Sequence, residues 1–144
     1  SNRKGVDYDV KNIGWNYYMN EFSAAIGLVQ LKKLDNANNK RKIIAKKYSK
    51  EISLENKMPF VNGCSYHFYW IKVKNRTKFR KKLFERGIET GIHYKPIHTF
   101  SFYKSKINLP VTEKVSKEIV SLPTHPNLSK KDLEKIIKTV NEFS

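Results

Sequence analysis

Residues 14–52 read GWNYYMNEFSAAIGLVQLKKLDNANNKRKIIAKKYSKEI, and the spacing of their apolar side chains decides the fold. Side chains three and four positions apart are Phe22, Ala25, Ile26, Val29, Leu34, Ala37, Ile44, Ala45, Tyr48 and Ile52. This period predicts one long helix, or two helices in series, with a buried face. Residues 24–28 are apolar or small all round, so we expect them to be covered on every side. The Asn-rich residues 35–39 predict a bend, because Asn and Asp side chains compete for backbone hydrogen bonds.

Length and composition are those of one folded domain. The chain has 144 residues, of which 39% are hydrophobic and 12% aromatic, so it can form a real core. No apolar run approaches the ~20 residues of a membrane span, and nothing near the first residue resembles a secretory signal. The single cysteine, Cys64, cannot form an internal disulfide, which fits a reducing compartment. We expect a cytoplasmic protein with a linker at residues 1–13 and one domain at 14–144.

The net charge of +16 keeps more than one function open. Such an excess can hold phosphate-rich partners, so a stand-alone module that binds nucleic acid is one hypothesis. The charge comes mainly from lysines spread over all the predicted helices, and no aromatic-basic ribonucleoprotein pattern accompanies it. A solvated surface, or a fragment whose acidic counterpart lies elsewhere, explains the charge equally well.

Three short segments downstream are predicted strands. Residues 66–73, YHFYWIKV, are dense in aromatic and β-branched side chains, which predicts a central strand buried largely on both faces. Residues 88–93 predict a second strand, and residues 119–122, stopped by Pro123, predict a third. Lys95-Pro96 forces an extended turn, so residues 93–103 should form a loop with a short helical end.

Three helices are expected between and after these strands. The first is capped by Thr77, directs Phe79, Leu83 and Phe84 inward and stops at Gly87. The second starts at Thr112. The last has Ser129 as its N-cap and an apolar face of Leu133, Ile136, Ile137, Val140 and Phe143. Strands interleaved with helices predict an α/β (α+β) sandwich of two layers, in which a small sheet is covered by helices and a long N-terminal helix.

One loop could carry chemistry, namely His93-Tyr94-Lys95-Pro96-Ile97-His98. It places two imidazoles and a phenol on a proline-stiffened segment, where side chains can be aimed at a ligand, although a surface loop with incidental histidines is equally compatible with the sequence. The histidines and Cys64 show no zinc spacing, so no metal site is predicted. No glycine-rich phosphate loop, nucleophile elbow or carboxylate pair is present, and we nominate no catalytic residue.

Taken together, these stretches resemble the DegT/DnrJ/StrS sugar aminotransferases. GWNYYMNEFSAAIGLVQLKKLD followed by KRKIIAKKY is similar to the signature of that family. SYHFYWIKV, LFERGIETGIHYKPIH, Leu109-Pro110 and SLPTHPNLSKKDLEKII then match in the same order. The resemblance implies the small C-terminal domain of a pyridoxal-phosphate enzyme of the aspartate aminotransferase fold (fold type I). It also implies that the large N-terminal domain, which carries the aldimine lysine, is a missing partner.

The resemblance assigns roles to four residues. Asn16 matches the asparagine of the motif G-Y-N-Y-R-M, which in several members reaches the cofactor phosphate of the partner subunit, so a homodimer is implied. Tyr18 stands where the motif has arginine, which removes a cation. His93, Tyr94 and His98 match the loop H-Y-x-P-x-H near the nucleotide-sugar site, which implies contact with a nucleotide-linked keto-sugar.

The resulting hypothesis is an aminotransferase domain for cell-surface polysaccharide or amino-sugar biosynthesis, inactive alone and with no pyridoxal phosphate bound to this chain by itself. Some relatives use the same fold for dehydration, so transamination is not the only reaction that the resemblance allows. The alternatives from other classes are the nucleic-acid-binding module and a non-catalytic interaction or dimerisation domain. The interaction domain is suggested by Trp15, Tyr17, Tyr18 and Trp70, which a small domain could leave exposed.

Overall fold

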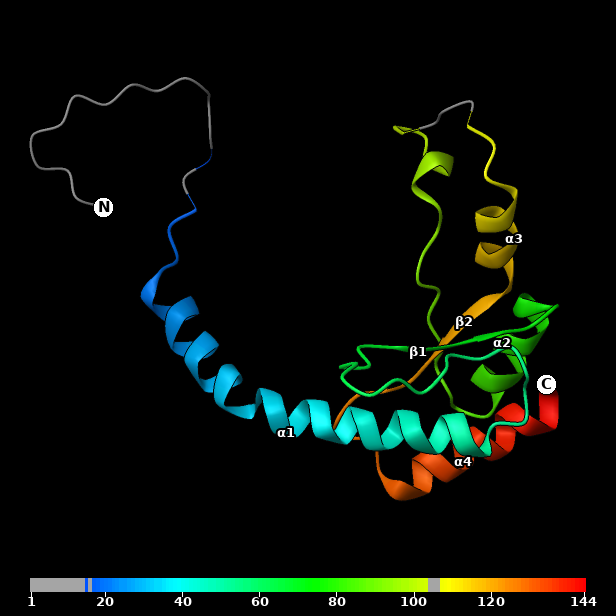
Figure 1. The fold of residues 1–144 in the computed structure, drawn as a ribbon, viewed down its shortest axis with the longest axis horizontal. Helices are drawn as coiled ribbons and strands as arrows, with labels where there is room; N and C mark the ends of the chain where they lie inside the picture. Colours follow the sequence, from blue (N-terminus) through cyan, green and yellow to red (C-terminus); the bar gives the residue numbers. More distant parts are fainter. Residues whose placement is uncertain (1–14, 16, 104–106) are drawn as a thin grey trace, which may run out of the picture. The chain divides into compact units, whose positions relative to one another are not determined.

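The computed structural model describes residues 15, 17–103 and 107–144, and the structural statements that follow concern those residues. The elements in chain order are α1 (Glu21–Glu51), β1 (Tyr69–Lys72), α2 (Arg76–Glu85), the 3-10 helix η1 (Ile97–Thr99), α3 (Pro110–Glu118), β2 (Ile119–Leu122) and α4 (Lys130–Phe143) (Figure 1). The chain divides into two compact units, Ser1–Lys33 and Leu34–Ser144. The described part contains no helix long and apolar enough to cross a membrane.

Helix α1 is one continuous element and not two in series. Its first turn is capped by Asn20, whose Oδ1 accepts a hydrogen bond of 2.8 Å from the amide of Ser23. The helix continues without a break through residues 35–39. In the unit Leu34–Ser144 its predicted apolar stripe is buried at Ile44, Ala45 and Tyr48.

The N-terminal unit leaves its apolar side chains in solvent. Ile26 is 63% exposed and Leu28 is 62% exposed, so the described residues do not supply the cover that we predicted for residues 24–28. The large exposed side chains of this unit are Trp15, Tyr17, Tyr18, Met19, Phe22, Ile26, Leu28, Val29 and Leu31. Exposed apolar surfaces of this extent commonly mark contact sites in folded proteins.

The sheet consists of β1 and β2, which pair antiparallel with Tyr69 opposite Leu122 and Ile71 opposite Val120. Those four side chains are buried and point to the same face, because side chains in a strand alternate. The C-terminal half of α1, α2 and α4 contribute to the same core, and α1 and α4 lie side by side (Figure 1). The predicted two-layer α/β architecture is confirmed.

Two of the three predicted strands were too long, whereas the third, residues 119–122, is confirmed as β2. The segment 66–73 forms a strand only at Tyr69–Lys72, because Tyr66 has a φ of +50° that no regular strand allows. Trp70 and Lys72 are half-buried, so the prediction of burial on both faces is wrong. The segment 88–93 makes a single bridge, between Gly91 and Ser121, instead of a strand.

Two helices begin earlier than predicted, and one side chain faces outward. Asn75, not Thr77, caps α2 by accepting a hydrogen bond of 3.2 Å from the Lys78 amide. Helix α3 starts at Pro110, where the fixed φ of proline suits the first turn, and not at Thr112. Phe84 is 67% exposed. This orientation differs from the inward one that we predicted.

The ends of α2 and α4 are confirmed. Gly87 follows the last turn of α2 with a φ of +72°, a conformation that favours glycine. Ser129 caps α4 through a hydrogen bond of 3.1 Å from the Asp132 amide. The predicted apolar face of α4 is buried at Leu133, Ile136, Ile137 and Val140.

Tyr48 and Tyr69 are two buried core tyrosines whose hydroxyls are bonded to loop carbonyls. Tyr48 donates to the carbonyl of Pro123 at 2.8 Å, and Tyr69 donates to the carbonyl of Met58 at 2.8 Å. Their ring centroids lie 5.2 Å apart. Burial raises the pKa of Tyr48, and burial raises the pKa of Tyr69 to about 12. Both side chains therefore favour the protonated form in the folded state.

We predict that the chain loses stability as the pH rises above about 10, the pKa of an unfolded tyrosine. Between that value and the raised folded pKa of Tyr69, about 12, the unfolded chain binds fewer protons than the folded chain, so ΔG of unfolding falls. Below pH 10 this contribution is fully present. Urea unfolding at pH 8 and at several values between 10 and 12 measures the slope.

The matched variants are Tyr48→Phe and the exposed Tyr18→Phe. Tyr48→Phe should cost about 1 kcal/mol at pH 8, because the Pro123 carbonyl loses its partner, and should flatten the alkaline slope. Tyr18→Phe should change neither quantity. An alkaline slope that is equally steep in all three proteins would contradict the assignment.

Candidate functional site

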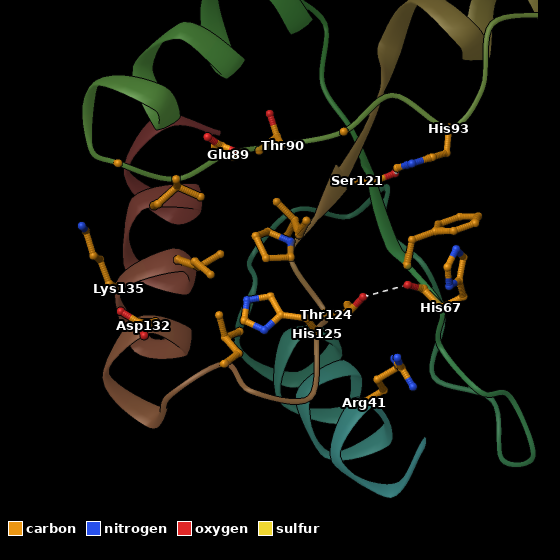
Figure 2. A pocket seen from close by; sticks show the side chains of 18 residues that line it. Arg41, His67, Glu89, Thr90, His93, Ser121, Thr124, His125, Asp132 and Lys135 are labelled. Atoms are coloured by element: carbon orange, nitrogen blue, oxygen red, sulfur yellow. Dashed lines mark hydrogen bonds between the residues drawn. The ribbon is translucent and has the colours of Figure 1, made fainter. Parts of the chain in front are cut away.

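A cavity of about 860 Å³ opens in the unit Leu34–Ser144 beside the Gly91–Ser121 bridge. Its wall comes from four places, namely residues 87–93, the end of β2 with residues 123–125, the start of α4, and the pair His67 and Phe68 with Arg41 of α1 (Figure 2). The lining combines the polar side chains labelled in Figure 2 with apolar ones such as Ile88, Leu122 and Ile136. Of the predicted loop residues 93–98, His93 lines this cavity.

His93 is held at one side of this cavity by contacts of different kinds. Its Nδ1 lies 2.9 Å from the hydroxyl oxygen of Ser121, and Figure 2 shows the two side chains directed toward each other. One ring face stacks on Phe68, with centroids 5.3 Å apart and planes inclined by 15°. These contacts fix both the plane and the rotation of the imidazole.

Gly91 leaves the space that the His93 ring occupies. A Cβ atom at position 91 would lie 2.5 Å from Cε1 of His93, which is closer than such atoms can approach. The backbone of Gly91 is itself fixed, because its amide and carbonyl both bond to those of Ser121 at 2.9 Å. Arg80 anchors the preceding residue by donating to the hydroxyl of Thr90 at 2.9 Å and to its carbonyl at 2.7 Å.

Tyr94 points away from the core and is 65% exposed. Its ring meets the His93 ring edge-on, with centroids 4.8 Å apart and planes at 83°. It also lines a second cavity, of about 420 Å³, that runs along α3. The phenol is therefore accessible to a ligand while its ring is supported.

His98 is separated from the His93 cavity. Its Nε2 lies 3.2 Å from a carboxylate oxygen of Glu113, and its side chain is only 13% exposed. It does not line the large cavity. His98 thus connects η1 to α3, and its predicted contact with substrate stays a prediction.

Asn16 lies outside the described residues, so its predicted role stays a prediction as well. The residues on either side of it, Trp15 and Tyr17, are exposed. No group of three or more metal-ligating side chains occurs in the part of the chain that the structure describes.

Sequence reasoning missed Phe68, Gly91 and Ser121, the three residues that hold His93. The signal for Ser121 was present, because it is the one polar residue in the apolar segment IVSL. Gly91 gave no turn signal of its own. Its importance comes from the approach of His93, which only the folded chain brings about.

Solved structures that resemble this chain in fold and sequence are aminotransferases. An aminotransferase from Brucella abortus matches 96% of this chain with 39% of its own, at 32% identity and a TM-score of 0.83. Helicobacter pylori PseC, an aminotransferase involved in the biosynthesis of pseudoaminic acid, matches 94% of this chain with 40% of its own, at 30% identity and a TM-score of 0.82.

The family follows from the sequence match. The model of the DegT/DnrJ/EryC1/StrS aminotransferase family matches residues 1–141, so the chain belongs to that family. A curated relative, the dTDP-4-dehydro-2,3,6-trideoxy-D-glucose 4-aminotransferase of Saccharopolyspora spinosa, is 32% identical over 136 residues. That match covers 89% of this chain and 35% of the relative, so the chain spans about a third of the relative's length.

We predict that Gly91→Ala displaces His93 from Phe68. The added Cβ would meet the imidazole at 2.5 Å, and the ring must move because the bridge to Ser121 holds the backbone. Overpacking of this kind costs about 1–3 kcal/mol of stability. NMR contacts between the protons of the two rings, present in the parent chain, should be lost.

Gly27→Ala is the matched control, since nothing lies within 4 Å of a Cβ at that helical position. It should leave the ring contacts intact and stabilise α1 by about 0.5–1 kcal/mol. If the His93–Phe68 contacts persist in Gly91→Ala, the role given to Gly91 is wrong.

Proposed function

We propose that this chain forms the small domain, residues 14–144 after a linker at 1–13, of an aminotransferase that acts on a nucleotide-linked keto-sugar. The main support for this proposal is the family match over residues 1–141. Two relatives support the substrate class, since one is a dTDP-keto-sugar aminotransferase and the other takes part in pseudoaminic acid biosynthesis. By analogy the product would serve cell-surface polysaccharide or amino-sugar biosynthesis.

The proposed cofactor is pyridoxal phosphate (PLP). A protein of similar fold, the sugar aminotransferase Spr1654 from Streptococcus pneumoniae, has a solved structure in its PLP-form. This cofactor would supply an electron sink for the bonds at the amine-bearing carbon of the substrate, and a lysine amine of the protein would hold it in the site. The described residues do not fit that task by themselves. Among the lysines that the structure describes, only Lys135 lines the large cavity, and it lies exposed on α4.

A companion domain would therefore hold the cofactor, and the exposed surface of the N-terminal unit supports this part of the proposal. Aromatic and aliphatic side chains between Trp15 and Leu31 lie open to solvent on this surface. An apolar area of this kind marks a contact with another folded body. We propose the large domain as that body, in a homodimer in which Asn16 contacts the cofactor phosphate of the partner subunit.

His93, Tyr94 and His98 are proposed to contact and orient the substrate. For His93 and Tyr94 this fits the geometry, because both line cavities and both rings are supported by Phe68. The charge of +16 adds a long-range attraction for a nucleotide diphosphate. The same charge was the sole support for the nucleic-acid hypothesis, so an anionic substrate accounts for it without a second function.

We predict that the 144-residue chain alone shows no transamination and no absorbance band of bound cofactor. The reason is that the described residues offer no buried lysine beside the cavity. The full-length protein should show both properties, measured by amine formation from the keto-sugar nucleotide and by visible absorbance. Activity of the chain alone, or dehydration instead of amination by the full-length protein, would contradict the proposal.

We predict that substitution of His93 raises KM more than it lowers kcat. A contact made equally in the ground state and in the transition state affects substrate binding alone. In the full-length enzyme, His93→Gln and Tyr94→Phe should each raise the KM for the nucleotide sugar about fivefold, the value of one hydrogen bond. The change in kcat should stay within about twofold.

The control for this measurement is Thr139→Ala. Thr139 is buried in α4 and its hydroxyl bonds within that helix, to the carbonyl of Lys135. Its loss should leave KM unchanged. A large fall in kcat with unchanged KM in His93→Gln would instead assign His93 to the chemical step.

A further inference from the structure

Ser121 is a buried polar residue in the middle of an apolar strand. It is 3% exposed, and its neighbours Val120 and Leu122 point into the core. Because side chains alternate along β2, Ser121 points to the opposite face of the sheet. Its backbone groups are both bonded to Gly91, so the side chain is carried by a fixed piece of main chain. The hydroxyl faces His93.

The direction of the Ser121–His93 hydrogen bond depends on which of the two groups supplies the hydrogen, the Ser121 hydroxyl or Nδ1 of the neutral ring. Within the described residues, His93 Nδ1 is the single hydrogen-bond partner of the Ser121 hydroxyl. If Nδ1 carried the proton of the neutral ring, the buried hydroxyl hydrogen would have no acceptor, which is costly. The arrangement that satisfies both groups has Ser121 donating and Nδ1 accepting. The ring proton then resides on Nε2.

We infer that Ser121 is a positioning residue that fixes His93 as the Nε2–H tautomer, so that His93 offers a hydrogen-bond donor to an acceptor oxygen of the substrate. Nε2 has no hydrogen-bond partner in the part of the chain that the structure describes, so the donor is free to meet a ligand. The substrate half of this inference rests on the proposed function. The tautomer half does not.

The ligand chemistry follows from the donor. A neutral imidazole with its proton on Nε2 can donate to a carbonyl, hydroxyl or phosphate oxygen, and it cannot accept from an ammonium group at that atom. A nucleotide-linked keto-sugar offers all three oxygen types. Phe68 on one ring face and Gly91 at the Cε1 edge keep this donor in one direction, which lowers the entropy lost on binding.

The first test reads the tautomer directly in the 144-residue chain. Histidine labelled with ¹⁵N gives separate signals for the two ring nitrogens, and His93→Gln identifies those of His93. At a pH where the ring is neutral, we expect the directly bonded proton on Nε2 and an unprotonated Nδ1. A proton mainly on Nδ1 overturns the inference, and this measurement needs no variant of Ser121 to fold.

Ser121→Ala and Thr139→Ala form the matched pair for the same spectrum, since each removes one buried hydroxyl. Ser121→Ala should shift the His93 nitrogen signals toward an average of two tautomers. Thr139→Ala should leave them in place. If both variants leave the His93 signals unchanged, Ser121 does not position the ring.

The second test is a double-mutant cycle in the full-length enzyme. Ser121→Ala should raise the KM for the nucleotide sugar about fivefold, and it should add less than twofold when His93 is already replaced by Gln. Independent, multiplying effects overturn the positioning role. If the tautomer result holds and the enzyme shows no effect of His93→Gln on KM, the proposed substrate contact is wrong while the Ser121–His93 pairing stands.

Discussion

The fold depends on the burial of one helical stripe against one face of a two-stranded sheet. A sheet of two strands is not stable by itself in water, so a helix layer must cover it. In the unit Leu34–Ser144, α1 supplies Ala45 and Tyr48, which are fully buried. The Tyr48 hydroxyl then bonds the carbonyl of Pro123, 75 residues further along the chain. This bond fixes the position of the end of β2 relative to α1.

The candidate site is a consequence of the same register. With Val120 and Leu122 committed to the core, the residue between them has to face the other way. A slip of one residue would bury Ser121 in the apolar layer and direct Val120 toward His93. The core therefore specifies the orientation of the imidazole through strand alternation, and the core residues Ile88, Leu122 and Ile136 also line the cavity. The site and the fold share one constraint and cannot vary independently.

The sequence was sufficient for the features that rest on local periodicity. The apolar stripe on the C-terminal half of α1, the face of α4 and the cap at Ser129 were predicted and are confirmed. The errors concern features that depend on distant partners. The segment 88–93 has the composition of a strand, but a ladder also needs a neighbour along its length, and β2 offers one only at Gly91. A distant partner also explains why His98 does not line the cavity of His93, because Glu113 of α3 bonds His98, and the predicted contact of His98 with substrate stays a prediction.

The two parts of α1 show why a local pattern can be correct while its environment is not given by this chain. The helical period is the same from Phe22 to Ile52, yet the residues near Tyr48 are buried and those near Ile26 are exposed. Local sequence specifies that a face is apolar, whereas burial requires a second surface of matching shape. The Saccharopolyspora spinosa relative is about three times as long as this chain, so its additional residues could supply such a second surface. The exposed half of α1 therefore lacks a covering surface among the described residues, and this is the physical basis for proposing that a companion domain packs against it.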